Sequence, residues 1–139
     1  APGVVQALQQ ADLILVAPSN PVVSIGPILA VPGLRDGIRA ATAPVLGFAG
    51  ILGGAPVLGM AHRLLPAIGV DVDAAAVGLH YGARARGGVL DGWAMDTADA
   101  ASVERIQEAG LRPVVTDLIM RDPASTAAFV SYAIKSATS

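Results

Sequence analysis

The sequence contains no cysteine, which excludes disulfide bonds, thiolate metal sites and thiol chemistry. Charged residues make up only 14% of the chain, and the formal net charge is -2. Because so few cations cannot build a basic surface, we expect neither nucleic acid nor an anionic membrane as a partner. Stability must come from packing of the hydrophobic residues, which form 53% of the sequence. The lack of cysteine also fits a reducing compartment, so we expect a cytoplasmic protein.

The sequence also lacks a hydrophobic run that could stay helical across a membrane. Its longest uncharged windows, residues 13–34 and 40–61, do have the length of a membrane span. However, the first contains four prolines, and the second contains two prolines and five glycines. Such segments cannot keep a helix whose backbone is satisfied in lipid, so both windows predict buried strands with loops. We also expect no secretory signal, since no basic segment is followed by an apolar one near the start.

Apolar runs of strand length alternate with helical patterns along the chain. We predict strands at residues 13–17, 44–49, 89–95 and 111–116, and helices at 4–11, around 34–36, and at 57–68, 73–85, 100–109 and 122–136. Strands that alternate with helices in this way are parallel and are joined by right-handed crossovers. The sequence therefore predicts a three-layer, Rossmann-like α/β fold, with a mostly parallel sheet and helices on both faces. Its 139 residues would form a single domain or part of one.

Ligands in such sheets bind beyond the carboxyl ends of the strands, which selects residues 18–27, 50–59, 96–99 and 117–121. In the first of these segments, Ser19, Asn20 and Ser24 can donate hydrogen bonds to phosphate oxygens. A helix that begins near Pro27 would also aim free backbone N–H groups at the same place. The alternative is a turn followed by a helix cap, because Ser, Asn and Pro are favoured in turns. The residues alone leave both interpretations open.

The other three segments carry weaker signals. Gly53 and Gly54 allow the backbone to approach a ligand closely or simply to turn tightly, and they match neither a dinucleotide fingerprint nor a P-loop. The aspartates at strand ends can hold Mg²⁺, but Asp96, Asp99 and Asp122 are equally placed as helix caps. Arg84 can clamp a phosphate or belong to a solvated turn. A further set of side chains is predicted to be solvated or packed rather than catalytic: His62, Arg63, His80, Arg86 and Trp93.

The segment from Asp12 to Leu29, DLILVAPSNPVVSIGPIL, is similar to the hallmark segment of the CofD family. Similarities in order and spacing continue at residues 31–35, at the Gly53-Gly54 pair, at residues 59–64 and at residues 90–92. Within the family, the chain resembles the actinobacterial FbiA branch. The resemblance runs across most of the chain and is weakest over its last part.

Members of this family transfer a phospholactyl or enolpyruvyl-phosphate group from a guanosine-diphosphate donor to the deazaflavin Fo. They release GMP, use Mg²⁺ and act in coenzyme F(420) biosynthesis. The resemblance implies the same transferase activity, substrates and cofactor here. It also implies a set of residues that bind the donor nucleotide and its phosphates: Ser19, Asn20, Pro21, Ser24, Pro27, Gly53 and Gly54.

Family members are longer, and their Gly-rich loop and key acidic residues precede the region seen here. The resemblance therefore implies a C-terminal portion of a longer protein, with the catalytic residues and metal ligands upstream of it. The chain departs from the family pattern at Ala49-Gly50, where a Ser-Pro pair is expected. It departs again where lysine, proline, aspartate and lysine are expected and the chain has Leu58, Met60, His62 and Arg63.

Two other functions fit the same residues. One is a non-catalytic regulator that binds nucleotide sugars, similar to the YvcK-type proteins. The other is a structural half that supplies the sheet and a self-association surface, and the low charge leads us to expect a homo-oligomer. The sequence does not distinguish a lactyl from an enolpyruvyl donor.

Overall fold

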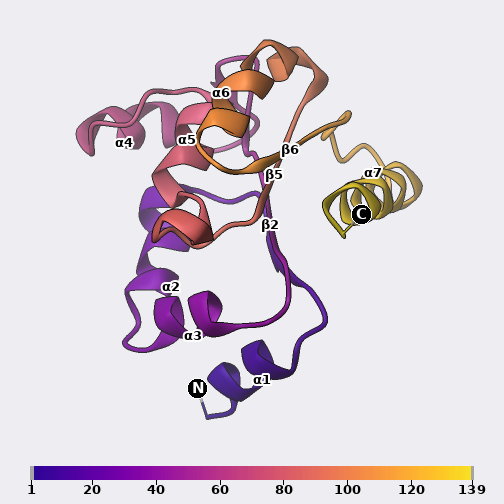
Figure 1. The fold of residues 1–139 in the computed structure, drawn as a ribbon. Helices are drawn as coiled ribbons and strands as arrows, with labels where there is room; N and C mark the ends of the chain where they lie inside the picture. The colour runs from indigo at the N-terminus through magenta and orange to yellow at the C-terminus, as the bar shows by residue number, and fades with distance from the viewer. Residues whose placement is uncertain (1, 139) are drawn as a thin grey trace.

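Residues 2–138, which the computed structural model describes, form a four-stranded parallel sheet between helices. The strands lie in the order β1 (Ile14–Val16), β2 (Val45–Phe48), β5 (Gly92–Met95) and β6 (Arg112–Val115). Helices α5 (Ala74–Tyr81) and α6 (Val103–Glu108) cover one face, and α7 (Pro123–Thr138) lies on the opposite face (Figure 1). The predicted three-layer α/β architecture is therefore confirmed.

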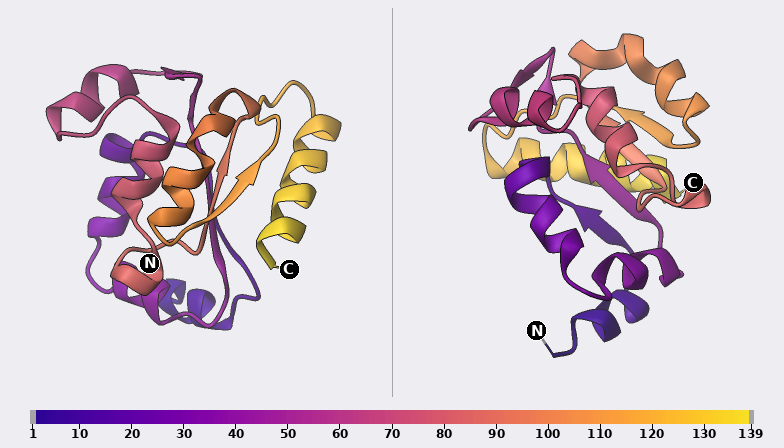
Figure 2. Two further views of the ribbon diagram at one scale, coloured as in Figure 1. Left: turned by 45° about the horizontal axis from the view of Figure 1, so that its top comes forward. Right: turned by 90° about the vertical axis from the view of Figure 1, so that its left-hand side faces the viewer.

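Several of the shorter elements lie at the two ends of the sheet (Figure 2). Helix α1 (Val4–Gln10) packs against α3 (Leu34–Ala40) where β1 and β2 begin, and the 3-10 turn η2 (Arg84–Arg86) leads into β5. Other short elements follow strands β1, β2 and β5 along the chain. After β1 come the π-helical turn η1 (Pro21–Ile25) and α2 (Gly26–Ala30), which contacts α3. After β2 come the hairpin of β3 (Ile51–Leu52) and β4 (Ala55–Pro56) and then α4 (Ala61–Ala67), and after β5 comes the 3-10 turn η3 (Thr97–Ser102). Among residues 2–138, no helix combines the length and the apolar character needed to cross a membrane.

The centre of the sheet is buried on both faces. All residues of β2 and β5 are buried, as the apolar runs predict for central parallel strands. Gly47 on β2 lies in register with Trp93 on β5, and a Cβ atom at Gly47 would come within 2.7 Å of the indole ring. The missing side chain at Gly47 thus leaves the space that the Trp93 ring fills.

Several predicted element boundaries are wrong, and glycine accounts for two of them. The strand predicted from residue 89, for example, begins only at Gly92. The helix predicted from residue 57 begins only at Ala61, because Gly59 has a φ of 82°, which an α-helix does not accept. The helix predicted to reach residue 85 ends at Tyr81, where Gly82 has a φ of 73°. The helix predicted to begin near Pro27 begins earlier, since η1 starts at Pro21 and continues into α2.

Candidate ligand-binding site

A pocket of about 280 Å³ opens at the carboxyl ends of the strands. Its walls come from the loops after β1, β2 and β6, from the segment before α4, and from α5. Segments 18–21, 48–52 and 118–120 all contribute, so three of the four segments selected by the strand-end rule meet here. The fourth, residues 96–99, is not among the lining residues.

Most of the residues that line the pocket are aromatic or aliphatic. Phe48, Tyr81 and Trp93 line it and keep 6%, 5% and 1% of their surface exposed. The Trp93 ring is fixed from two sides: its Nε1 donates to the Ala74 carbonyl at 2.9 Å, and a Cβ at Gly78 would lie 2.8 Å from the ring. A rigid apolar interior of this kind suits the flat face of an aromatic ring better than a charged group.

The mouth of the pocket carries the polar groups of the first loop. Ser19 and Asn20 line it together with Pro18 and Pro21. Asn20 Oδ1 accepts hydrogen bonds from the backbone N–H groups of Val22 at 2.9 Å and Val23 at 3.2 Å. The helix-cap interpretation is therefore confirmed for the Asn20 carbonyl. The cap leaves the amide nitrogen of Asn20 as the group that can donate to a ligand.

Ser24 and Pro27, the other two candidates of this loop, are not among the residues that line the pocket. Ser24 lies within η1 and is half-buried, and Pro27 is exposed in α2. The backbone N–H groups that we expected near Pro27 to be free belong to a continuous helix, in which Gly26 N–H donates to the Pro21 carbonyl. These N–H groups are therefore not free at a helix start, and the binding role of Ser24 and Pro27 stays a prediction.

Gly53 and Gly54 form the turn of the β3–β4 hairpin, with φ values of 56° and 80°. They do not line the pocket, which instead uses Gly50, Ile51 and Leu52 from the same loop. The Gly53 N–H donates to both carboxylate oxygens of Asp99, at 3.2 and 3.1 Å. The tight-turn interpretation thus describes the geometry of this glycine pair.

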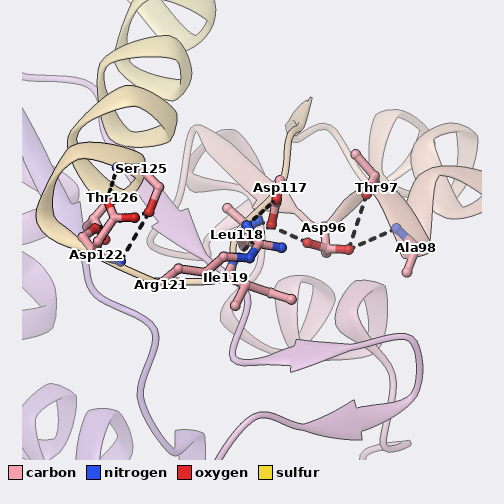
Figure 3. A network of polar contacts seen from close by, with 10 residues as sticks. All are labelled: Asp96, Thr97, Ala98, Asp117, Leu118, Ile119, Arg121, Asp122, Ser125 and Thr126. Atoms are coloured by element: carbon pink, nitrogen blue, oxygen red, sulfur yellow. Dashed lines mark hydrogen bonds and ion pairs between the residues drawn. The ribbon is translucent and has the colours of Figure 1, made fainter.

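A polar network holds the loop after β6 against the end of β5 (Figure 3). Asp96 Oδ2 accepts the Leu118 N–H at 2.9 Å, and Asp96 Oδ1 accepts the Ala98 N–H at 3.0 Å. Next to it, Asp117 pairs with Arg121 at 2.6 Å, and this guanidinium lowers the pKa of the Asp117 carboxyl. The cap predicted for Asp96 is confirmed, and the network positions Leu118, Ile119 and Met120 at the pocket.

These carboxylates do not make a magnesium site by themselves. The oxygens of Asp96, Asp99 and Asp117 accept from backbone N–H groups, from the Thr97 hydroxyl or from Arg121, and none of the three residues lines the pocket. Within residues 2–138, no three His, Asp or Glu side chains lie close enough together to hold a metal ion. Mg²⁺ prefers several oxygen ligands around it, so the described donor set does not fit the ion.

The remaining charged candidates lie outside the pocket. Arg84 binds Asp91 through Nε at 3.0 Å and donates to the Ala41 carbonyl at 2.7 Å, at the amino ends of the strands. It is therefore a structural clamp and neither a phosphate ligand nor part of a solvated turn. His62 and Arg63 are exposed on α4, as predicted. Among the positions that depart from the family pattern, Ala49, Gly50 and Leu58 line the pocket.

Sequence reasoning missed the residues that complete the pocket from distant elements. The sequence predicts a strand at Phe48, a solvated or packed side chain at Trp93, and a helix at Tyr81, but it predicts a pocket wall at none of them. One signal was available, since Val77 and Tyr81 lie four residues apart on one helix face, where an i, i+4 pair points the same way. Their convergence with Leu118 depends on tertiary structure and has no local signature.

Comparison with known proteins places this chain in a family. Residues 1–131 match the family described as 2-phospho-L-lactate transferase CofD. The chain belongs to the CofD family. The resemblance of residues 12–29 is thereby confirmed.

Within the CofD family, the chain is similar to proteins named phosphoenolpyruvate transferase. It is 51% identical to one from Streptomyces griseus over 135 residues, which is 97% of this chain and 41% of that protein. It is 49% identical to one from Kitasatospora aureofaciens over 96% of this chain and 40% of the relative. It is also 49% identical to one from Mycolicibacterium smegmatis, over 93% of this chain and 38% of the relative. The chain thus spans about two fifths of the length of these curated relatives.

Proposed function

We propose that this chain is the C-terminal part of a transferase of coenzyme F(420) biosynthesis. The enzyme would move an enolpyruvyl-phosphate or phospholactyl group from a guanosine-diphosphate donor to the deazaflavin Fo and release GMP. The observation that carries the proposal is the pocket at the strand ends, which joins the hallmark loop to an aromatic interior in a member of the CofD family. The names of the three relatives favour phosphoenolpyruvate chemistry over lactate chemistry.

In this proposal, the chain contributes binding and orientation. The acceptor hydroxyl attacks the phosphorus that carries the transferred group, the bond to the GMP oxygen breaks, and the hydroxyl proton leaves to a base. The lining residues include no carboxylate, histidine or lysine that could be this base. They offer the Ser19 hydroxyl and the Asn20 amide as donors at the mouth and apolar walls that exclude water inside. Alignment and exclusion of water are a large part of what phosphoryl-type transfer needs from a protein.

Mg²⁺ remains a proposed cofactor of the complete reaction. Its charge would neutralise phosphate oxygens when it is bound. Since the described carboxylates do not fit the ion, we propose that its ligands lie outside these 139 residues. Mg²⁺ alone should therefore leave the melting temperature of this chain unchanged.

Thermal melting with GDP, UDP and Fo, each with and without Mg²⁺, tests the proposal. A ligand that binds only the folded state at a concentration of 100 times its Kd stabilises it by about 2.7 kcal/mol. For a domain of this size, that corresponds to a rise in Tm of roughly 5 to 15 °C. We expect GDP, Fo or both to produce it. A response to UDP alone would favour the nucleotide-sugar regulator, and no response to any of the three would contradict a substrate site in this chain.

A further inference from the structure

Tyr81 places a polar atom in an otherwise apolar wall of the pocket. It is the last residue of α5, keeps 5% of its surface exposed, and its ring centre lies 5.8 Å from that of Trp93. The neighbouring Trp93 N–H is already bonded to the Ala74 carbonyl, and Phe48 has no polar atom. Within residues 2–138, the Tyr81 hydroxyl has no hydrogen-bond partner.

The Tyr81 hydroxyl is not fully enclosed, and Tyr81 is one of the residues that line the pocket. No described side-chain oxygen or nitrogen is both fully enclosed and unbonded. The unbonded Tyr81 oxygen must therefore reach open space, and the pocket is the space that Tyr81 lines. Burial raises the pKa of this hydroxyl above its usual value, so it stays protonated and can donate. A hydroxyl that reaches open space can be hydrated in the free chain, and an acceptor on the ligand would take the place of that water.

The size of the pocket limits what can meet Tyr81. A volume of about 280 Å³ is close to the lower end for small-molecule sites, so it suits a ring system better than a whole nucleotide. Aromatic walls favour a planar ring, which stacks on them or meets them edge to face. The rest of such a ligand would extend out of the pocket through the mouth beside Ser19 and Asn20.

We propose that the Tyr81 hydroxyl anchors the edge of a planar heterocycle by donating to a carbonyl oxygen or ring nitrogen. This inference rests on the proposed function, in which two molecules bring that chemistry. Guanine in the donor and the deazaflavin ring in the acceptor both carry ring carbonyl groups. Tyr81 would then exclude rings that lack an acceptor at this position, since a site with a committed donor rejects them.

The test compares Tyr81→Phe with Tyr132→Phe, which removes the same hydroxyl from the only other tyrosine of the chain. Tyr132 is 52% exposed on α7 and does not line the pocket. The affinities of GDP and of Fo are measured separately by calorimetry. Fluorescence of Trp93, the only tryptophan, reports whether the ligand enters the pocket. For one of the two ligands, we expect Tyr81→Phe to raise Kd about 3- to 10-fold, and Tyr132→Phe to leave it unchanged.

The two hypotheses fail in different ways. If GDP or Fo binds the native chain and changes Trp93 fluorescence, but Tyr81→Phe binds it equally well, the Tyr81 anchor is wrong and the proposed function stands. If neither ligand binds the native chain, both are contradicted. Without ligand, Tyr81→Phe should melt close to the native temperature, because the hydroxyl makes no hydrogen bond within the described residues. A lower melting temperature would mean that the hydroxyl supports the fold and would overturn the anchor.

Discussion

Both carboxylate oxygens of Asp99 accept the backbone N–H of Gly53, at 3.2 and 3.1 Å, and so hold the β3–β4 turn against η3. Asp99 keeps 8% of its surface exposed. Burial raises the pKa of its carboxyl, the Gly53 N–H lowers it, and the nearby carboxylates Asp73 and Asp96 raise it further. The net direction is upward, so folding favours the protonated form of Asp99.

The raised pKa of Asp99 predicts a pH dependence of stability. A carboxyl whose pKa is higher in the folded chain contributes stability that is complete below the unfolded pKa, about 3.9. That contribution is lost as the pH rises through the folded pKa. Asp99→Asn keeps an acceptor for the Gly53 N–H and does not ionise. We expect the stability of Asp99→Asn relative to the native chain to increase from about pH 4 upward, measured by urea unfolding across the pH range.

Asp117→Asn supplies the control with the opposite sign. Arg121 lowers the pKa of Asp117, so the ionised form stabilises the native chain above the unfolded pKa, and this is lost as the pH falls through the folded pKa. Asp117→Asn should therefore lose stability relative to the native chain at neutral pH and regain it in acid. Equal slopes for the two variants would contradict the assignment of Asp99.

The central strands could be predicted because their signal is local. Continuous apolar runs marked β2 and β5, and burial on both faces is what such runs require. The hairpin could not be predicted in the same way, since β3 and β4 have only two residues each and Gly53-Gly54 fits a turn in many contexts. Likewise, the π-helical turn from Pro21 depends on the cap that Asn20 makes, which the sequence only permitted.

The site was predictable where it follows from topology. The strand-end rule located the loops around Ser19 and around Gly50, because it needs only the strand positions. It could not supply Tyr81 or Trp93, which lie on a helix and within a strand and reach the pocket through packing. The binding roles of Ser24, Pro27, Gly53 and Gly54 stay predictions, as does self-association, which light scattering on the purified chain would test.

Gly78 should be intolerant of a side chain, because Trp93 occupies that space. A Cβ at Gly78 would lie 2.8 Å from Trp93 Cδ1 and Nε1, and a crowded core of this kind costs about 1 to 3 kcal/mol. We expect Gly78→Ala to lower the free energy of unfolding by that amount and to shift Trp93 fluorescence.

Gly37→Ala is the matched control in helix α3, where the new Cβ would meet Leu8 and Val5 at an ordinary 3.5 Å. There the gain in helix propensity should leave stability unchanged or raise it by about 0.5 to 1 kcal/mol. Similar losses at the two glycines would contradict the role of the indole ring.

Arg84 should matter for stability and not for binding. Its guanidinium meets Asp91 at 3.0 and 2.5 Å and also donates to the Ala41 carbonyl, and only 18% of the side chain is exposed. Lysine has a single amino group and cannot make all of these hydrogen bonds, so Arg84→Lys should lower the free energy of unfolding in urea by about 1 to 3 kcal/mol.

The exposed pair of Arg121 and Asp117 provides the comparison, and Arg121→Lys should change the free energy of unfolding little. Because Arg84 lies at the amino ends of the strands, ligand affinity should be unchanged in Arg84→Lys. A weakened affinity would reopen its role as a phosphate ligand.

Asn20 combines a structural and a proposed binding role, and two substitutions separate them. Its carbonyl caps η1, so Asn20→Ala should lose about 1 kcal/mol of stability as well as affinity. Asp is an equally good cap, so Asn20→Asp should keep the stability of the native chain. It replaces the amide donor with a negative charge at the pocket mouth, however, and a charge-assisted contact to phosphate then becomes a repulsion.

We therefore expect Asn20→Asp to melt at the native temperature and to bind GDP at least about tenfold more weakly by calorimetry. Ser24→Ala tests the same loop from the other side, since Ser24 lies within η1 and does not line the pocket. If the geometry of the free chain describes the bound state, Ser24→Ala should bind GDP as the native chain does. A loss of affinity confined to Ser24→Ala would show that the phosphates lie over the helical turn and not at the pocket mouth. Equal binding by all three proteins would remove this loop from the nucleotide site.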